Sequence, residues 1–317
     1  MEGSSYNRLL GRRLLIKYEP FTTLILQYII LPSRDWVLGK GHSHFTSLTP
    51  MAYISRIEIE SLWSGLHHVV WDLRPDVNIL SGVNGVGKST ILNRVVKYLL
   101  NVDRLAKTDD GVTLTYAPEG TEQVRFDVIR SFDRPLISRD ILSKVADISL
   151  HSELDFQLYQ LQRRYLDYQV NMSNRMVQLF TENAPDAQQK AQEIASEKNH
   201  FFDLIDQLFA DTGKRVNRSS NEIMLLQYNE NLNPYQLSSG EKQMLIILLT
   251  VLVQNRQPYT LFMDEPEISL HVEWQQRLIG LIRDLNPNAQ IILTTHSPAV
   301  IMDGWTDCVV DVEDILV

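Results

Sequence analysis

The chain has 317 residues, of which 44% are apolar, so it can bury a sizeable core as one large domain or as a domain with a lobe. Its 30 Lys and Arg against 39 Asp and Glu give a formal net charge of −9, which argues against a wholly basic nucleic-acid binder but leaves room for a local basic groove. A single cysteine excludes an internal disulfide and fits a reducing cytosol, and no apolar stretch reaches the ~18 residues that a membrane span needs. We therefore expect a cytoplasmic protein with no membrane partner.

Residues 1–50 look unlike the remainder of the chain. They contain a short apolar run at 24–31 with no clear partner, followed by a loop at 39–44. An alternating strand begins only after Met51. We expect residues 1–50 to be an N-terminal extension that is not native or is poorly ordered, with residues 51–317 as the main domain. The alternative is an arm that docks on a partner.

Three early strands, predicted at residues 54–60, 68–73 and 77–81, lead to a glycine-rich loop. Residues 82–89 read Gly-Val-Asn-Gly-Val-Gly-Lys-Ser and match the phosphate-binding pattern G-x-x-x-x-G-K-[ST] in full. The strand before the loop and a helical pattern from residue 89 to 100 supply the context that this motif requires. The sequence therefore predicts a nucleotide site at this loop.

The residue types of the loop suit phosphate and magnesium. Glycines let successive backbone N–H groups face the phosphates, Lys88 adds a point charge on the β- and γ-phosphates, and Ser89 offers a hydroxyl to Mg²⁺. The predicted nucleotide-binding residues are Gly82, Asn84, Gly85, Val86, Gly87, Lys88, Ser89 and Thr90.

The middle of the chain changes from strand to helix. Residues 112–116 and 123–130 predict a pair of strands joined by a turn at 118–120. A helical insertion follows at about residues 140–212, broken at 183–186 into two helices. Apolar residues of the first helix form a stripe close to a heptad repeat: Leu154, Leu158, Leu161, Tyr165, Tyr168, Met172, Met176 and Leu179. The insertion is either a lobe packed on its own domain or a projecting arm for a partner or DNA.

A second anion site is predicted where residues 237–243, Leu-Ser-Ser-Gly-Glu-Lys-Gln, open a helix. The backbone amides and hydroxyl at such a helix start attract a phosphate, which we expect another subunit to hold for the most part. The predicted contacts are Ser238, Ser239, Gly240 and Glu241.

An acidic pair follows a buried strand at residues 259–263. The strand ends at Asp264 and Glu265, and the carboxyl end of a parallel strand is where α/β sheets bind ligands. We predict that Asp264 reaches Mg²⁺ and that Glu265 polarises the attacking water as a general base. A further β-branched strand at 291–295 ends at His296.

The order of these motifs resembles the soluble, non-transporter ABC ATPases over about residues 53–312. The motifs are the phosphate loop, a helical insertion, Leu-Ser-Ser-Gly-Glu, Asp-Glu-Pro-Glu, Ser-Leu-His and Thr-Thr-His-Ser-Pro. This branch includes RecF-like and SMC-like proteins and the ATPase halves of overcoming-lysogenization-defect nucleases. The resemblance implies an α/β P-loop fold with a mostly parallel core sheet, an antiparallel β-subdomain and the helical insertion.

The resemblance also implies roles for particular residues. Two copies of the chain would close on two ATP molecules with Mg²⁺, as an ATP-dependent homodimer. His296 would be the switch histidine that hydrogen-bonds the γ-phosphate, so that the predicted catalytic residues are Glu265, His296 and Lys88. Residues 267–271 would be the D-loop that crosses the dimer interface. For His271, an interface or nucleotide contact is about as well supported as simple surface capping.

Three points depart from the family pattern or stay open. Ser239 stands where transporters commonly have glycine, and Glu241 replaces their usual glutamine, which makes its contact with the nucleotide less certain. The Q-loop is unassigned, with Gln123 and Gln157 as candidates.

The predicted function is ATP binding and hydrolysis that switches a partner. The short segment after His296 leaves no room for a nuclease domain, so we expect an effector on another chain, such as a nuclease or toxin in phage defence, or DNA. The alternatives are a RecF-like DNA repair ATPase and the nucleotide-binding subunit of an ABC transporter.

Overall fold

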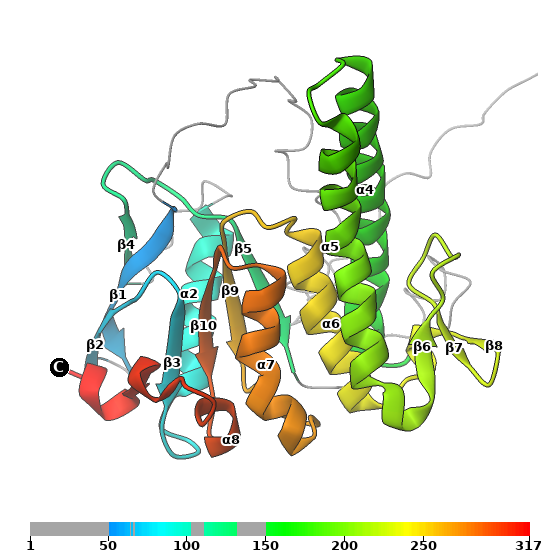
Figure 1. Cartoon of the computed structure of the whole chain (residues 1–317). Helices are drawn as coiled ribbons and strands as arrows, with labels where there is room; N and C mark the ends of the chain where they lie inside the picture. Colours follow the sequence, from blue (N-terminus) through cyan, green and yellow to red (C-terminus); the bar gives the residue numbers. More distant parts are fainter. Residues whose placement is uncertain (1–50, 64, 66, 103–110, 132–149) are drawn as a thin grey trace, which may run out of the picture. The chain divides into compact units, whose positions relative to one another are not determined.

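The computed structural model describes residues 51–63, 65, 67–102, 111–131 and 150–317 (Figure 1). The chain divides into two compact units, Met1–Thr49 and Pro50–Val317, and the fold given below is that of the second unit. The expected extension at residues 1–50 and the first part of the expected insertion, 140–149, lie outside the described residues. These two boundaries therefore stay predictions.

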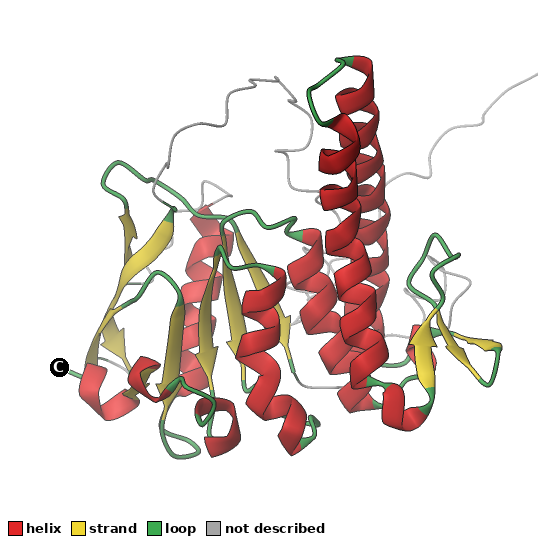
Figure 2. Cartoon of the chain, viewed as in Figure 1, coloured by secondary structure: helices red, strands yellow, loops and turns green. Residues whose placement is uncertain are grey.

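A five-stranded parallel sheet forms the centre of the second unit (Figure 2), in the order β11-β3-β10-β9-β5. Its strands are β3 (Val77–Ser81), β5 (Phe126–Arg130), β9 (Tyr259–Asp264), β10 (Ala289–Thr294) and β11 (Val309–Asp311). Every residue of β10 is buried, as expected for a central strand covered on both faces. The predicted α/β fold with a mostly parallel core sheet is confirmed.

The two faces of this sheet are covered by different elements. Leu261 and Leu293 belong to the core cluster formed with α4 to α7, whereas Phe262 and Ile292 belong to the cluster formed with α2 and β1. This alternation follows from the two-residue period of a strand. The long helices are α2 (Lys88–Val102), α4 (Glu153–Thr181), α5 (Ala187–Leu208), α6 (Ser239–Val253) and α7 (Val272–Leu285).

An antiparallel sheet of order β2-β1-β4 packs on the α2 side. Its strands are β1 (Tyr53–Leu62), β2 (His67–Asp72) and β4 (Val112–Ala117). The three early strands were therefore predicted correctly, but the pairing of 112–116 with 123–130 was wrong. β4 pairs with β1, while β5 joins β9 in the parallel sheet. A Pro-Gly turn predicts a change of direction, whereas pairing depends on which core each strand face can enter.

A small sheet that the sequence did not predict follows α5 and precedes α6 along the chain. It consists of β6 (Lys214–Val216), β7 (Leu225–Gln227) and β8 (Glu230–Leu232), paired antiparallel. Three-residue strands carry too little periodicity to be recognised in a sequence. The remaining short elements are α8 (Pro298–Ile301) and the 3₁₀ turns η2 (Ala210–Thr212), η3 (Pro234–Gln236), η4 (Thr306–Cys308) and η5 (Val312–Ile315).

The helical hairpin of α4 and α5, hereafter the arm, is packed on the domain at its base and projects from it at its tip. Near the base, Leu158 and Tyr165 of α4 and Phe201 and Ile205 of α5 are buried in the cluster that includes α6. Between Tyr168 and Phe201, no described residue is buried. At 1.5 Å per residue α4 is about 43 Å long, and its distal half extends with α5 beyond the sheet (Figure 1). The base of the hairpin is thus packed on the domain and the distal half projects, while a contact of the distal half with a partner or DNA stays a prediction.

Within the part of the chain that the structure describes, no helix has the length and apolarity needed to cross a membrane.

The division of the hairpin can be tested by two matched substitutions. Phe201 is fully buried, whereas Phe180 near the tip is 55% exposed. We expect Phe201→Ala to lower the free energy of unfolding by about 3–5 kcal/mol and Phe180→Ala to change it by less than about 0.5 kcal/mol. Urea unfolding followed by circular dichroism measures both. Equal losses from the two substitutions would contradict a hairpin packed only at its base.

Candidate active site

The site is assembled by three strands that end at the same edge of the parallel sheet. The phosphate loop follows β3, Asp264 and Glu265 stand at the end of β9, and His296 follows β10. In the register of the sheet, Thr294 lies opposite both Leu80 and Asp264. Because the carboxyl ends of adjacent parallel strands coincide, residues far apart in the sequence meet there.

The phosphate loop needs glycine for backbone and for packing reasons. Gly87 has φ of +104°, and a Cβ atom there would lie 2.3 Å from a ring carbon of Trp63. Asn84 and Gly85 are exposed at the tip of the loop, as is Thr90 just beyond it. These positions leave the backbone of the loop accessible to a phosphate.

Lys88 is bound by its own loop. Its Nζ donates to the carbonyl oxygens of Gly82 at 2.8 Å and Val83 at 3.2 Å, and the residue is only 3% exposed. The side chain of Val86 packs against the α2 core, so this residue offers the site only its backbone. The ammonium is therefore confined within the concave side of the loop, where a phosphate would replace the carbonyl oxygens.

The two predicted magnesium ligands lie in contact. The Ser89 hydroxyl donates to Oδ1 of Asp264 at 2.8 Å, and the Thr294 hydroxyl donates to the same oxygen at 2.6 Å. Among the described residues, no group of three or more His, Cys, Asp or Glu could hold a metal ion. One carboxylate and one hydroxyl suit Mg²⁺, which takes its other ligands from water and phosphate oxygens.

Three predicted catalytic residues meet at one carboxylate oxygen. Oε1 of Glu265 lies 3.9 Å from Nζ of Lys88 and 3.5 Å from Nδ1 of His296. The backbone of Glu265 is left-handed, with φ of +48°, and its N–H donates to the backbone and the hydroxyl of Thr294. A non-glycine residue held in this region is strained, and such strain is typical of functional sites. The arrangement can hold a water for attack on a phosphate beside Lys88.

The signature run begins α6 with a reciprocal cap. Ser238 accepts from the backbone N–H of Glu241, and Glu241 Oε2 accepts from the backbone and hydroxyl of Ser238 at 3.0 and 2.9 Å. Oε1 of Glu241 accepts from Thr212 at 3.0 Å and from Lys214 at 2.8 Å. Both oxygens are thus used within the protomer. The predicted contact of Glu241 with a nucleotide stays a prediction, while Ser238 is exposed at the helix start.

The signature helix and the expected D-loop are in backbone contact. A Cβ atom on Gly240 would lie 2.3 Å from the carbonyl oxygen of Ser269, so only glycine permits this approach. Ser239 is the neighbouring helical residue, and it is partly buried. His271 is the exposed N-cap residue of α7, and its side chain makes no capping hydrogen bond. Its choice between an interface or nucleotide contact and simple surface capping stays open.

Two further residues near the site have weak sequence signals. Gln157 donates to the carbonyl oxygen of Arg130 at 3.1 Å, and Arg130 pairs with Asp264 at the carboxyl end of β5. This places Gln157, rather than the exposed Gln123, beside the site edge. Trp63, which we did not predict, lies against Gly87 and is 38% exposed. A lone tryptophan after a strand carries no local pattern.

These features define a P-loop ATPase of the ABC type. The chain belongs to the family described as "AAA domain, putative AbiEii toxin, Type IV TA system", whose model matches residues 121–303. The matched region includes the signature run, the acidic pair and His296.

Individual relatives agree with this family. The chain is 24% identical to the Septu protein PtuA of Bacillus thuringiensis, over 79% of this chain and 73% of that protein. It is 33% identical to the Retron Ec83 probable ATPase of Escherichia coli, over 27% of this chain and 18% of that protein. Among solved structures, it is similar to the Smc head domain with an extended coiled coil bound to the C-terminal domain of ScpA from Pyrococcus furiosus. That match has 13% identity and a TM-score of 0.45, and it covers 80% of this chain and 92% of the other.

The buried carboxylate of the signature run gives a test in acid. Burial acts to raise the pKa of Glu241, but hydrogen bonds from Lys214, Ser238 and Thr212 outweigh it, so the pKa is lowered. A lowered pKa in the folded state stabilises the fold above the unfolded-state value and loses this effect as pH falls through the folded-state value.

We therefore expect wild type to be more stable than Glu241→Gln at neutral pH, by about 1–3 kcal/mol. The difference should shrink as the pH is lowered below the unfolded-state pKa of about 4.3. Urea unfolding of both proteins between about pH 7 and pH 3.5 measures it. A difference that grows in acid would show that this carboxylate does not carry the effect.

Proposed function

We propose that the chain is an ATP-hydrolysing switch whose two copies close on two ATP molecules and control an effector on another chain. The observation that carries this proposal is the meeting of Lys88, Glu265 and His296 at one oxygen, beside the Ser89–Asp264 pair. Membership of the ATPase family supports nucleotide chemistry at this place. The exposed Ser238 at the start of α6 supports completion of the site by a second copy.

The residues of the chain act in sequence on the bound nucleotide. Lys88 exchanges the carbonyl oxygens of its loop for the β- and γ-phosphates, and Ser89 and Asp264 would hold Mg²⁺, which would supply positive charge near the transferring phosphoryl group. Glu265 accepts a proton from the water that attacks the γ-phosphorus, and the bond from that phosphorus to the bridging oxygen breaks, so that ADP leaves with that oxygen. His296 contacts the γ-phosphate, which departs as inorganic phosphate. Loss of that contact opens the dimer.

The signature helix is joined to the arm by a buried ion pair. Nζ of Lys242, in the first turn of α6, lies 2.8 Å from Oδ1 of Asp155, and their side chains are 12% and 3% exposed. The other oxygen of Asp155 caps α4 by accepting from the N–H groups of His151 and Ser152. Because Asp155 both caps α4 and pairs with the first turn of α6, a shift of α6 on dimer closure would move α4.

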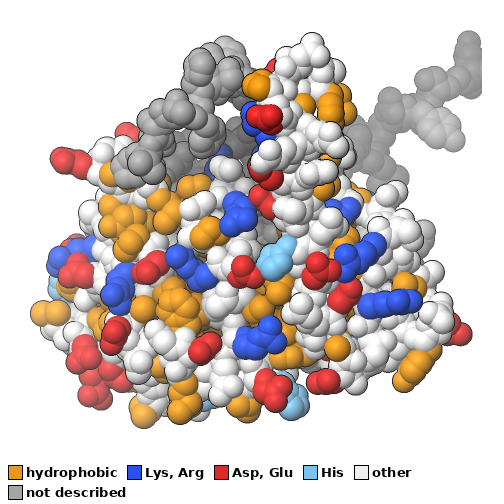
Figure 3. Space-filling model, in the orientation of Figure 1, with side chains coloured by type: hydrophobic (Ala, Val, Ile, Leu, Met, Phe, Trp, Pro, Cys, Tyr) orange, Lys and Arg blue, Asp and Glu red, His pale blue; other side chains and the backbone are white. Residues whose placement is uncertain are grey.

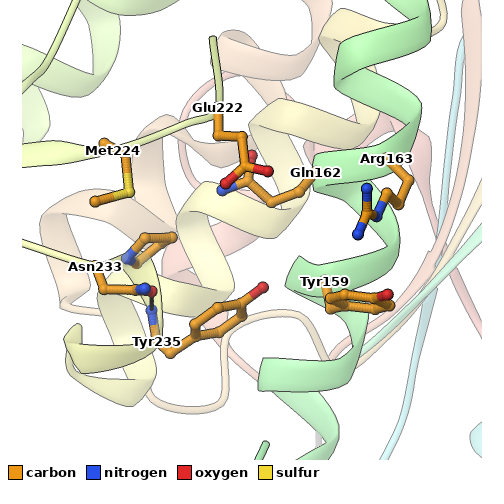
Figure 4. A pocket seen from close by; sticks show the side chains of 8 residues that line it. Tyr159, Gln162, Arg163, Glu222, Met224, Asn233 and Tyr235 are labelled. Carbon is orange, nitrogen blue, oxygen red and sulfur yellow. Dashed lines mark hydrogen bonds between the residues drawn. The ribbon is translucent and has the colours of Figure 1, made fainter. Parts of the chain in front are cut away.

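A small surface pocket lies where the arm meets the segment that enters the signature run (Figure 4). Tyr159 and Arg163 come from α4, and Tyr235 comes from η3. Gln162, which also lines the pocket, both donates to and accepts from the backbone of Ile223, at 2.8 Å each. These contacts give the arm a second attachment to the region before α6.

The choice of a protein effector in defence rests on the relatives and on the arm. The Septu and retron relatives support a defence role, which we carry over as part of the proposal. Val170, Val177 and Phe180 on the distal half of α4 are more than half exposed, so they offer an apolar surface to a protein partner.

DNA as the partner is less well supported. Arg164 is held by both oxygens of Asp127, Arg163 lies over the Tyr159 ring, and Arg175 donates to Asn255. On the face shown in Figure 3, Lys and Arg are interspersed with Asp and Glu rather than gathered. A RecF-like repair ATPase would need a basic surface to hold the phosphate backbone.

The proposed function is tested by Glu265→Gln. This change keeps the shape of the side chain but removes the proton acceptor, so turnover should fall by about 10²-fold or more. ATP should then hold a dimer that sedimentation velocity detects. Glu273→Gln, on the exposed first turn of α7, is the matched control and should hydrolyse ATP as wild type does. Unchanged turnover in Glu265→Gln would overturn the assignment of the general base.

The link to the arm is tested by Lys242→Met, which keeps most of the aliphatic stem and removes the charge. In wild type, ATP should change the hydrogen exchange of α4, whereas in Lys242→Met this change should be lost while ATP still binds. Hydrogen exchange followed by mass spectrometry, together with ATP binding by calorimetry, measures the two effects. An ATP-dependent change of the same size in both proteins would contradict transmission through this ion pair.

A further inference from the structure

A buried carboxylate beside the site has no role in the steps above. Glu267 is 4% exposed and follows the acidic pair at the start of the 267–271 segment. Its Oε1 accepts from the Thr295 hydroxyl at 2.5 Å and from the backbone N–H of His296 at 3.1 Å. The same oxygen lies 3.5 Å from Nδ1 of His296. One atom therefore accepts a hydrogen bond from the backbone of the histidine and lies close to its ring.

The other oxygen of this carboxylate has no such use. Among the described residues, Oε2 of Glu267 makes no hydrogen bond although it is buried. A buried oxygen without a partner disfavours folding, so Oε2 does not account for a carboxylate at this position. The contacts of Oε1 with Thr295 and His296 do account for it.

A second bridge joins the same two segments. The Ser297 hydroxyl donates to Oε1 of Gln275 at 2.7 Å, and Nε2 of Gln275 donates to the carbonyl oxygen of Leu270 at 2.9 Å. The segment 267–271 and the segment that carries His296 are thus tied at both ends. Ser269, between these ties, has its carbonyl oxygen against Gly240 of the signature helix.

We propose that Glu267 is the positioning residue of His296. Through Oε1 it fixes the backbone at His296 and keeps Nδ1 on the side of the two carboxylates of Glu265 and Glu267. Nε2 is then left for the γ-phosphate. Because Glu267 begins the segment that contacts Gly240, a displacement of that segment moves the histidine. This inference rests on the proposed ATPase function.

The first measurement is steady-state ATP hydrolysis by the full chain. Glu267→Ala should lower kcat at least tenfold with KM changed less than threefold, because the histidine acts after ATP has bound. Glu267→Gln should keep kcat within threefold of wild type, because an amide oxygen can accept the same hydrogen bonds. Glu273→Ala, an exposed carboxylate on the next helix, is the control and should match wild type.

A double substitution separates positioning from a general loss of structure. If Glu267 acts through His296, Glu267→Ala should have no further effect on kcat once His296→Ala is present. Effects of the two substitutions that multiply would overturn the inference, as would wild-type kcat in Glu267→Ala. Absence of ATP hydrolysis by wild type would instead overturn the proposed function.

The second measurement does not depend on turnover. In protein labelled with ¹⁵N-histidine, the ring signals of His296, identified by their loss in His296→Ala, report its protonation and hydrogen bonding. They should move in Glu267→Ala and stay near their wild-type positions in Glu267→Gln. Unchanged His296 signals in Glu267→Ala would overturn the inference whether or not the protein hydrolyses ATP.

Discussion

Parallel pairing of β3, β10 and β9 is the constraint on which the rest of the site depends. Leu80, Thr294 and Asp264 are paired in one row, so the phosphate loop, the switch segment and the acidic pair start from the same level. A slip of one residue would turn the Asp264 side chain to the other face of the sheet. It would also separate Asp264 from Ser89 and Thr294, both of which bind its Oδ1. The contact between the two predicted magnesium ligands, Ser89 and Asp264, therefore depends on the strand register.

The face of the parallel sheet that packs on α4 to α7 connects the site to the arm. The signature helix α6 is capped by its own Glu241, paired through Lys242 to the cap of α4, and in contact with the 267–271 segment at Gly240. The contacts of Glu241 and Lys242 are short and largely buried, so α6 has few ways to move alone. The arm combines a well-packed base with an exposed tip, which suits an element that moves as a body and touches something else.

The motifs could be predicted because each is local in the sequence. The glycine spacing of the phosphate loop, the Leu-Ser-Ser-Gly-Glu cap and the acidic pair after β9 are short runs whose chemistry needs only their own neighbours. Glu267 and Trp63 could not be predicted in the same way. The Glu267 side chain is buried against Thr295, which lies 28 residues further along the chain. Trp63 follows β1 but lies against Gly87 in the phosphate loop, which follows β3. Pairing of β4 and β5 was misjudged because a turn signal carries no information about distant partners.

Composition, periodicity and motif order thus determined the class of fold, the motifs of the candidate site and the presence of a helical hairpin, since all of these follow from residues close together in the chain. Tertiary structure decided which groups lie around the carboxylate of Glu265, which carboxylate accepts from the backbone of His296, and where the hairpin stops being packed. Those outcomes depend on contacts between segments separated by tens to hundreds of residues, such as Lys88 with Glu265 and Asp155 with Lys242. Contacts of that kind are set by how whole elements pack, and no local pattern encodes them.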